Sequence, residues 1–356
     1  MSGNTSVIKP HVAAITDAFP VFRYAAGSAI IMVVVMSAGY TLAYITPVLA
    51  LTFLSPGAKP PTLKSGITFI FIISIASLAG FLFTRLFIEF PLVFLPLLAL
   101  IIFHLYYTTS LQHMKMWLIL SLLLIPIVSM QSDKLGGIVA MNLVMNALLA
   151  MIMVGLVYFI FPAQGLAGTD KKIQPIPPLS DRQRYISAGI RILIVLPVLV
   201  LFFVFQWTES LLVLIFIAIL SMNPASNMRK SGIGIIIANI SGGLAAILVF
   251  NLLVIVPNVL FFGLLTLLSG LYFGNKLFSQ KPIAPLYGMA FSTFLLVLGS
   301  VTSSAEGEAG ETVWQRILQI GLAVIYIVVG FGLVDHLSRS KRVKNLSINA
   351  DQHEIH

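Results

Sequence analysis

Cysteine is absent from this chain, and charged residues are scarce. The absence of cysteine excludes disulfides, thiolate metal sites and cysteine-dependent catalysis. Charged side chains make up 9% of the 356 residues and apolar side chains 58%, whereas a soluble domain carries about 25% charged residues. Such a depletion of charge is typical of a protein whose solvent is lipid.

Motifs for several other protein classes are also missing. The chain has no Gly-rich Lys-Ser/Thr loop for a nucleotide, no Gly-x-Ser-x-Gly elbow and no His or Glu cluster with metal-ligand spacing. These absences predict a non-enzyme without metal or cofactor. The net charge of +9 would suggest nucleic acid in a soluble protein. Here the basic residues lie in loops between apolar runs, so no nucleic-acid partner is expected.

The chain does contain a series of apolar runs, most of them close to the length of about 20 residues that a membrane span needs. The runs cover about residues 25–43, 45–56, 66–87, 90–107, 116–130, 136–161, 186–206, 210–222, 232–256, 258–274, 283–301 and 313–334. The first run is interpreted as an uncleaved span and not as a signal peptide. The sequence therefore predicts an all-α polytopic membrane protein with about twelve transmembrane helices. Because the second and eighth runs are short, roughly ten or eleven full crossings are the alternative.

The two halves of the chain resemble one another. Leu54-Ser55 is followed by Lys64-Ser65-Gly66-Ile67, and Leu220-Ser221 is followed at the same spacing by Lys230-Ser231-Gly232-Ile233. Upstream, Arg23-Tyr24 corresponds to Arg184-Tyr185. With six spans in each half, both halves begin on the same side of the membrane, which predicts two parallel six-helix repeats. The predicted units are an N-terminal segment (1–21), a first repeat (22–161), a linker (162–183), a second repeat (184–337) and a basic tail (338–356).

The positions of Lys and Arg predict the orientation. If the N-terminus is cytoplasmic, every Lys and Arg except Arg85, Lys134 and Arg316 falls on the cytoplasmic side. This bias follows the positive-inside rule and places both termini in the cytoplasm. The basic tail Arg339–Lys344 is then expected to contact anionic lipid.

The short second and eighth spans predict a transport site. Pro47 lies near the start of the second span and Pro56 near its end, while Asn223-Pro224 follows the eighth span. Short, Pro-interrupted spans at matching positions of two halves are a pointer to the substrate site of a transporter. A broken helix frees backbone groups, which are tolerated at membrane depth only beside protein or water. A tight hairpin without a ligand is the alternative.

The third and ninth spans each open with a basic residue beside a serine. Ser65 and Ser231 are predicted N-cap residues, and a helix N-terminus attracts anions. This pattern predicts two anion-attracting entrances on the cytoplasmic side. The alternative is that the basic residues only anchor the spans according to the positive-inside rule. The basic residues concerned are Lys59, Lys64, Arg229 and Lys230.

A few polar residues lie within or beside the spans. Arg191 is the candidate contact for a substrate carboxylate, because a guanidinium binds carboxylate with two parallel hydrogen bonds; its alternative role is snorkelling to the surface. Glu209 is the candidate proton-coupling residue, with an interfacial Glu as the alternative. Arg85 and Glu89 are interpreted as a local ion pair. Asn142 and Asn146 are interpreted as a helix–helix contact.

This pattern resembles the fusaric-acid-resistance family of aromatic acid exporters, to which plant malate channels are distantly similar. The residues that carry the resemblance are Arg23, Ser55, Pro56, Lys64, Arg184, Ser221, Pro224, Arg229, Lys230 and Gly232. The resemblance implies proton-driven efflux of aromatic or related carboxylic acids across the bacterial inner membrane, with Arg23 at the substrate. It also implies a periplasmic adaptor of the membrane-fusion type. Larger members carry a soluble domain, whereas the linker and tail here are short, so the chain resembles a compact branch.

The function that the sequence predicts is export of small organic anions, captured at the paired turns and released by rocking of the halves. A passive organic-anion channel is one alternative. A non-transporting scaffold of an envelope complex is another, and an intramembrane enzyme would need convergent His, Asp or Glu that the spans scarcely offer. Assembly into a homo-oligomer stays open.

Overall fold

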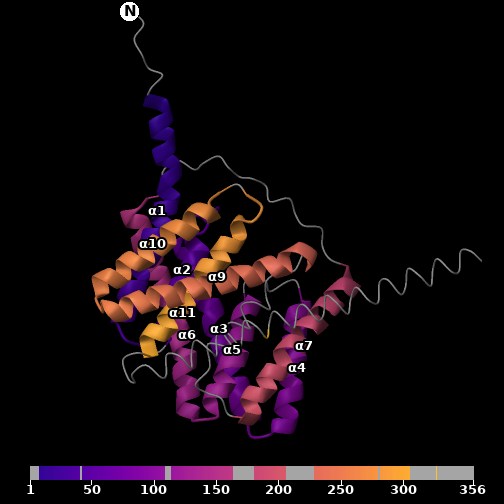
Figure 1. The fold of residues 1–356 in the computed structure, drawn as a ribbon. Coiled ribbons are helices and arrows are strands. Elements are labelled where there is room, and N and C mark those ends of the chain that lie inside the picture. The colour runs from indigo at the N-terminus through magenta and orange to yellow at the C-terminus, as the bar shows by residue number, and fades with distance from the viewer. Residues whose placement is uncertain are drawn as a thin grey trace, which may run out of the picture.

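The structure is a computed structural model that describes residues 8–40, 42–108, 114–162, 180–205, 228–279, 281–304 and 326. Across these residues the chain forms ten helices and no strand (Figure 1). The prediction of an all-α protein is therefore confirmed for the part of the chain that is described.

Each described helix overlaps one of the predicted apolar runs. They are α1 (Ile8–Ser37), α2 (Ile45–Leu54), α3 (Leu63–Phe87), α4 (Pro91–Tyr107), α5 (Met114–Ser129), α6 (Asp133–Ile160), α7 (Asp181–Phe205), α9 (Met228–Ile255), α10 (Val259–Leu277) and α11 (Ala284–Ser304). The predicted runs at 210–222 and 313–334 lie outside the described residues, Tyr326 excepted.

Seven of the described helices are long and apolar enough to cross a membrane. The qualifying stretches are Phe19–Ser37, Leu63–Phe87, Asp133–Ile160, Asp181–Phe205, Ile237–Ile255, Val259–Leu277 and Ala284–Ser303. The chain is thus a multi-pass membrane protein. Helix α2 has only 10 residues and is about 15 Å long, half the thickness of a hydrocarbon core.

Helix α1 begins at Ile8, well before the apolar run that was predicted to start near residue 25. Hydropathy locates the point at which a helix becomes apolar and not the point at which it begins. The apolar stretch of α1 starts at Phe19. The preceding turns extend α1 beyond that stretch, and Figure 1 shows them projecting from the bundle.

The interior of the bundle is formed by α5 and α11. Helix α5 is buried from Ile119 to Ser129, and α11 is buried from Thr293 to Val301. A helix that is apolar on all sides has no face suited to water and is expected at the centre of a bundle. Helix α5 packs against α3 and α6, whereas α11 packs against α9 and α10.

Two long interfaces join early helices to late ones: α1 packs along α10, and α4 packs along α7. In the α1–α10 interface a Cβ added to Gly270 would lie 3.0 Å from the Cα of Ala25, and one added to Gly274 would lie 3.1 Å from the ring of Tyr24. Small residues four apart allow two helix backbones to approach closely in a membrane. This interface therefore fixes α1 against α10 with little space between them.

Aromatic rings fill the α4–α7 interface. Phe94 of α4 stacks on Phe203 of α7 with ring centroids 5.5 Å apart, and Phe103 meets Tyr185 edge to face at 5.2 Å. Aromatic pairs in these arrangements stabilise an interface beyond the area that they bury, so ring contacts help to hold α7 against α4.

Candidate functional site

The structure places the predicted site residues in different environments. Arg23 and Pro47 are buried, Arg191 is partly buried, and the exposed ones are Pro56, Lys59, Lys64 and Ser65. Arg229, Lys230 and Ser231 lie in the first turn of α9, and their side chains are not among those described. Because α9 begins at Met228, the prediction of Ser231 as its N-cap was wrong. Glu209, Asn223 and Pro224 lie outside the described residues.

Arg23 is the charged residue that the bundle buries most deeply within the described part of the chain. Its exposed fraction is 7%, although it lies about one turn inside the apolar stretch of α1. The Nε atom is buried without a hydrogen-bond partner among the described residues. No Asp or Glu of the described segments forms an ion pair with it. A buried cation without a carboxylate partner is rare within spans and marks a functional site by default.

Tyr158 of α6 lies beneath the guanidinium of Arg23. The Cζ atom of Arg23 is 4.7 Å from the centre of the Tyr158 ring, which is a cation–π contact. The hydroxyl of Tyr158 donates a hydrogen bond of 2.8 Å to the carbonyl of Phe53 in the last turn of α2. One side chain thus contacts the arginine of α1 and the end of α2. Sequence reasoning missed Tyr158, because a tyrosine near the end of an apolar helix also fits an interfacial aromatic belt.

Close packing brings α1, α2 and α6 together one turn above Arg23. A Cβ added to Gly27 would lie 2.8 Å from Val157 of α6 and 3.2 Å from Leu54 of α2. On the other side of Arg23, Phe161 makes edge-to-face contacts with Phe19 and Phe22 at 6.4 and 5.6 Å. Along α1, Arg23 therefore lies between the close contact at Gly27 and the ring contacts of Phe19 and Phe22.

The chain leaves the helical conformation at both ends of α2, since Gly39 and Leu42 ahead of it have φ 64° and 65°. Pro47 occupies the first turn of α2, where a missing N–H removes no helical hydrogen bond. At the other end Ser55 is extended, with ψ 163°, and Gly57 has φ 79°, a left-handed conformation that suits glycine. The exposed Pro56 lies between them.

The beginning of α2 is held by a buried polar network. The Thr46 hydroxyl donates to Oδ1 of Asn146 in α6 at 2.6 Å, and the Tyr40 hydroxyl lies 2.7 Å from that of Thr46. This contact bears out the expected role of Asn146 in helix–helix packing. Burial raises the pKa of Tyr40, against a smaller lowering by the Thr46 hydrogen bond, so its hydroxyl stays protonated.

The start of α3 differs from the prediction. The N-cap is Thr62 and not Ser65, since the Thr62 Oγ1 atom accepts the Ser65 N–H at 3.2 Å. The Ser65 hydroxyl donates to the Thr62 carbonyl at 2.9 Å. Ser65 was placed wrongly because capping depends on where the helix begins, and α3 starts at Leu63, ahead of the apolar run. Lys64 remains exposed beside this turn, where its charge is available to attract anions.

Helix α7 carries two arginines with partners in α4. The Cζ of Arg191 lies 5.6 Å from the ring centre of Tyr106, and that of Arg184 lies 5.9 Å from Tyr107. Arg184 also forms an ion pair with Asp181 in the first turn of its own helix.

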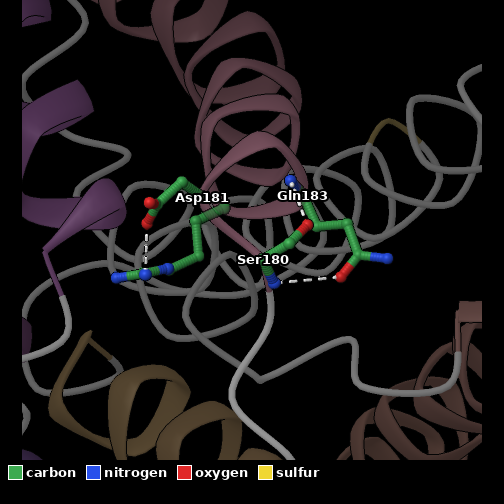
Figure 2. Close-up of polar contacts among 4 residues, drawn as sticks. Ser180, Asp181 and Gln183 are labelled. Carbon is green, nitrogen blue, oxygen red and sulfur yellow. Dashed lines mark hydrogen bonds and ion pairs between the residues drawn. The ribbon is translucent and has the colours of Figure 1, made fainter.

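Figure 2 shows the reciprocal cap that begins α7. The Ser180 N–H donates to Oε1 of Gln183 at 3.2 Å, and the Gln183 N–H donates to the Ser180 hydroxyl at 3.4 Å. Such a capping box occupies N–H groups that an anion would otherwise bind. The start of α7 is therefore closed by its own side chains.

The predicted ion pair of Arg85 with Glu89 is also wrong. Arg85 at the end of α3 pairs with Asp133 at the start of α6, and not with Glu89. The partner comes from a helix that α3 packs against, which local spacing could not reveal. Among the described residues no group of three or more His, Asp or Glu side chains is placed to hold a metal ion.

No family model, curated protein or solved structure matches this chain. The functional argument therefore depends on the geometry around Arg23 and on the pattern of the sequence.

Proposed function

We propose that this chain is an inner-membrane transporter that exports small organic anions. The observation that carries the proposal is Arg23, a buried cation whose Nε has no acceptor among the described residues. Keeping a charge in a low-dielectric interior without a partner costs several kcal/mol, about 2.5 to 3.5 on the membrane-insertion scale. A bound carboxylate would supply the missing charge and accept from the guanidinium, so the site is complete only with an anion.

The packing of the helices supports two parallel repeats. If 22–161 and 184–337 are corresponding units, then α1 and α7 are their first spans and α4 and α10 their fourth. The α1–α10 interface then has its counterpart in the α4–α7 interface, and α3–α5 has its counterpart in α9–α11. Tyr24 packs on α10 and Tyr185 packs on α4, as the matching Arg-Tyr pairs require. Twelve spans complete this arrangement.

The distribution of basic residues supports an outward direction of transport. With both termini in the cytoplasm, the Arg23 end of α1 faces the cytoplasm. The exposed Lys59 and Lys64 lie on the segment that links the end of α2 to α3. Basic side chains around an entrance raise the local concentration of anions. Anions are thus collected on the cytoplasmic side and bound at Arg23.

Aromatic carboxylic acids are the proposed substrates. Phe19 and Phe22 lie within about one turn of Arg23 on α1 and contact Phe161, and rings near the guanidinium favour an apolar, planar molecule. The resemblance to aromatic acid exporters agrees with this choice and adds the periplasmic adaptor. Proton coupling is proposed through Glu209. Replacing Glu209 with Gln should abolish the dependence of flux on a pH gradient, whereas a passive channel would keep both its flux and its pH response.

The proposal is tested by uptake into everted membrane vesicles with a panel of benzoate, 4-hydroxybenzoate, cinnamate and malate. Arg23→Gln should lower uptake about 100-fold and Arg23→Lys about tenfold, since lysine keeps the charge but loses the two-pronged contact. Arg182→Gln is the matched control, because Arg182 is exposed at the start of α7. Export is ruled out if the unaltered protein moves none of these acids. A reporter after Lys172 that proved periplasmic would overturn the orientation.

A further inference from the structure

Tyr158 is in contact with both the proposed anion site and the short helix beside it. We propose that Tyr158 is a positioning residue that transmits anion binding at Arg23 to the last turn of α2. This inference rests on the proposed function, because it needs an anion at Arg23. It adds a role for a residue that the sequence pattern did not single out, and it assigns α2 as the element that responds to the substrate.

The ring of Tyr158 fixes the face of the guanidinium that a substrate can approach. The Arg23 Cζ atom lies over the ring, 4.7 Å from its centre, so the ring occupies the space on that side of the guanidinium. The Nε atom lies in the guanidinium plane, buried and without an acceptor among the described residues. An incoming carboxylate therefore binds along the edge of the guanidinium. A tilt of the guanidinium then displaces the Tyr158 ring that it contacts.

The hydroxyl of Tyr158 connects this movement to α2. The last carbonyls of a helix have no partner within the helix, and the Phe53 carbonyl is one of them. It accepts the Tyr158 hydroxyl at 2.8 Å. Nearby, the Leu51 carbonyl accepts both the backbone N–H and the hydroxyl of Ser55, at 3.0 and 2.5 Å. The end of α2 is thus capped by a local residue and by a residue of α6.

The side of α1 that faces α10 is packed too closely to move in response to a ligand at Arg23. Tyr24, the neighbour of Arg23, packs against Gly274 and against the rings of Phe278 and Phe291. Beside it, Ala25 and Gly270 bring the α1 and α10 backbones into contact. Because close-packed backbones resist displacement, a change at Arg23 is taken up by Tyr158 and the end of α2, and not by α1.

The absence of cysteine makes a direct experiment possible. Ala58 lies in the turn after α2, where its N–H donates to the Ser55 carbonyl, so Ala58→Cys places a single reporter there. Its rate of maleimide labelling is measured in the full chain with and without the acid from the transport panel that moves fastest. Asn275→Cys, exposed on α10, serves as the control reporter, because no anion-dependent change is expected there.

Tyr158→Phe is the decisive variant, because it keeps the ring over Arg23 and removes only the hydrogen bond. We expect the acid to bind within about twofold of the unaltered affinity, while the transport rate falls about tenfold, the size of one lost hydrogen bond. The acid should change the labelling of the Ala58→Cys reporter as long as Tyr158 is present. It should leave that labelling unchanged when Ala58→Cys is combined with Tyr158→Phe. Tyr272→Phe, at an exposed tyrosine of α10, should behave as the unaltered chain.

A merely structural role for Tyr158 predicts a different result. Binding and rate would then fall together, or the response of the Ala58→Cys reporter to the acid would survive the loss of the hydroxyl; either result overturns the inference and leaves the exporter intact. If the unaltered protein neither binds nor moves any acid of the panel, the exporter and the inference both fail. Tyr158→Leu, which also removes the ring, should weaken binding about fivefold and separates the two contacts.

Discussion

The α1–α10 and α4–α7 interfaces occupy corresponding places in the proposed repeats, yet different side chains form them. Gly270 and Gly274 bring α10 against the backbone of α1, whereas stacked and edge-on rings fill the interface of α4 with α7. The arginines of the matching Arg-Tyr pairs, Arg23 in α1 and Arg184 in α7, differ in the same way. Arg23 is 7% exposed and has no carboxylate partner among the described residues. The side chain of Arg184 is 28% exposed and pairs with Asp181.

If the two halves are the proposed repeats, the comparison means that one copy has specialised while the other keeps a structural role. Close backbone packing between α1 and α10 stabilises the protein, and this stabilisation offsets the cost of an unpaired charge on the other side of α1. In α7 the equivalent charge is neutralised within the first turn and stays near the surface, where it needs no ligand. A ligand-dependent cation is therefore expected at Arg23 and not at Arg184.

Removing the charges should produce the largest difference between the two halves. Arg23→Met is expected to lower acid transport about 100-fold while leaving stability unchanged or raising it by about 1 kcal/mol, because an apolar side chain replaces an unpaired buried charge. Arg184→Met should change transport less than twofold, since its partner and exposure mark it as structural. Vesicle uptake and thermal unfolding in detergent measure the two effects. Loss of several kcal/mol in Arg23→Met would instead make Arg23 a structural residue.

The interfaces themselves should differ in their tolerance of larger side chains. Gly270→Val is expected to destabilise the protein by about 2 to 3 kcal/mol, because its Cβ would meet the backbone of α1. A Cβ on Gly155 of α6 meets nothing within 4 Å, so Gly155→Val is the matched control and should cost less than about 1 kcal/mol. Denaturation in detergent compares them. Equal losses would mean that the α1–α10 contact is no tighter than an open helix surface.

The helices could be predicted from sequence more fully than the site. From residue 45 to residue 160 the structure has helices within a few residues of the apolar runs, since hydropathy reports directly which segments avoid water. The burial of Arg23 could not be predicted in this way. At the edge of an apolar run it resembles an anchoring arginine, and its stacking partner Tyr158 lies far away in the chain. Only the packing of α1 against α6 distinguishes the two interpretations.

Capping and ion pairs show the same limit at short range. The Ser65 prediction was wrong because α3 begins at Leu63 and the cap falls on Thr62. The Arg85 prediction was wrong because packing offered Asp133, a partner outside the local sequence. Local patterns fix which residues are able to cap or pair, and tertiary packing decides which of them do so.

A smaller effect on transport is expected from the second arginine of α7. Arg191 is partly buried and stacks on Tyr106 of α4, so Arg191→Gln should lower acid transport about threefold, the value of one cation–π contact. Tyr106→Leu should give a similar loss if the stacking positions the arginine. A loss as large as that of Arg23→Gln would place Arg191 at the substrate. An unchanged rate would support the snorkelling interpretation.

The smallest effect is expected from the ion pair that distinguishes Arg184 from Arg23. Asp181→Asn removes the pair, but the Asp181 side chain is 77% exposed, so stability should fall by about 0.5 kcal/mol or less and transport should not change. Ser180→Ala, which opens the capping box beside it, should cost more, about 1 kcal/mol. The loss in Asp181→Asn should vanish at high salt, where exposed charges are screened. A loss of stability of about 2 kcal/mol that persisted at high salt would mean that the pair is desolvated. Arg184 would then be buried as Arg23 is, and the contrast between them would fail.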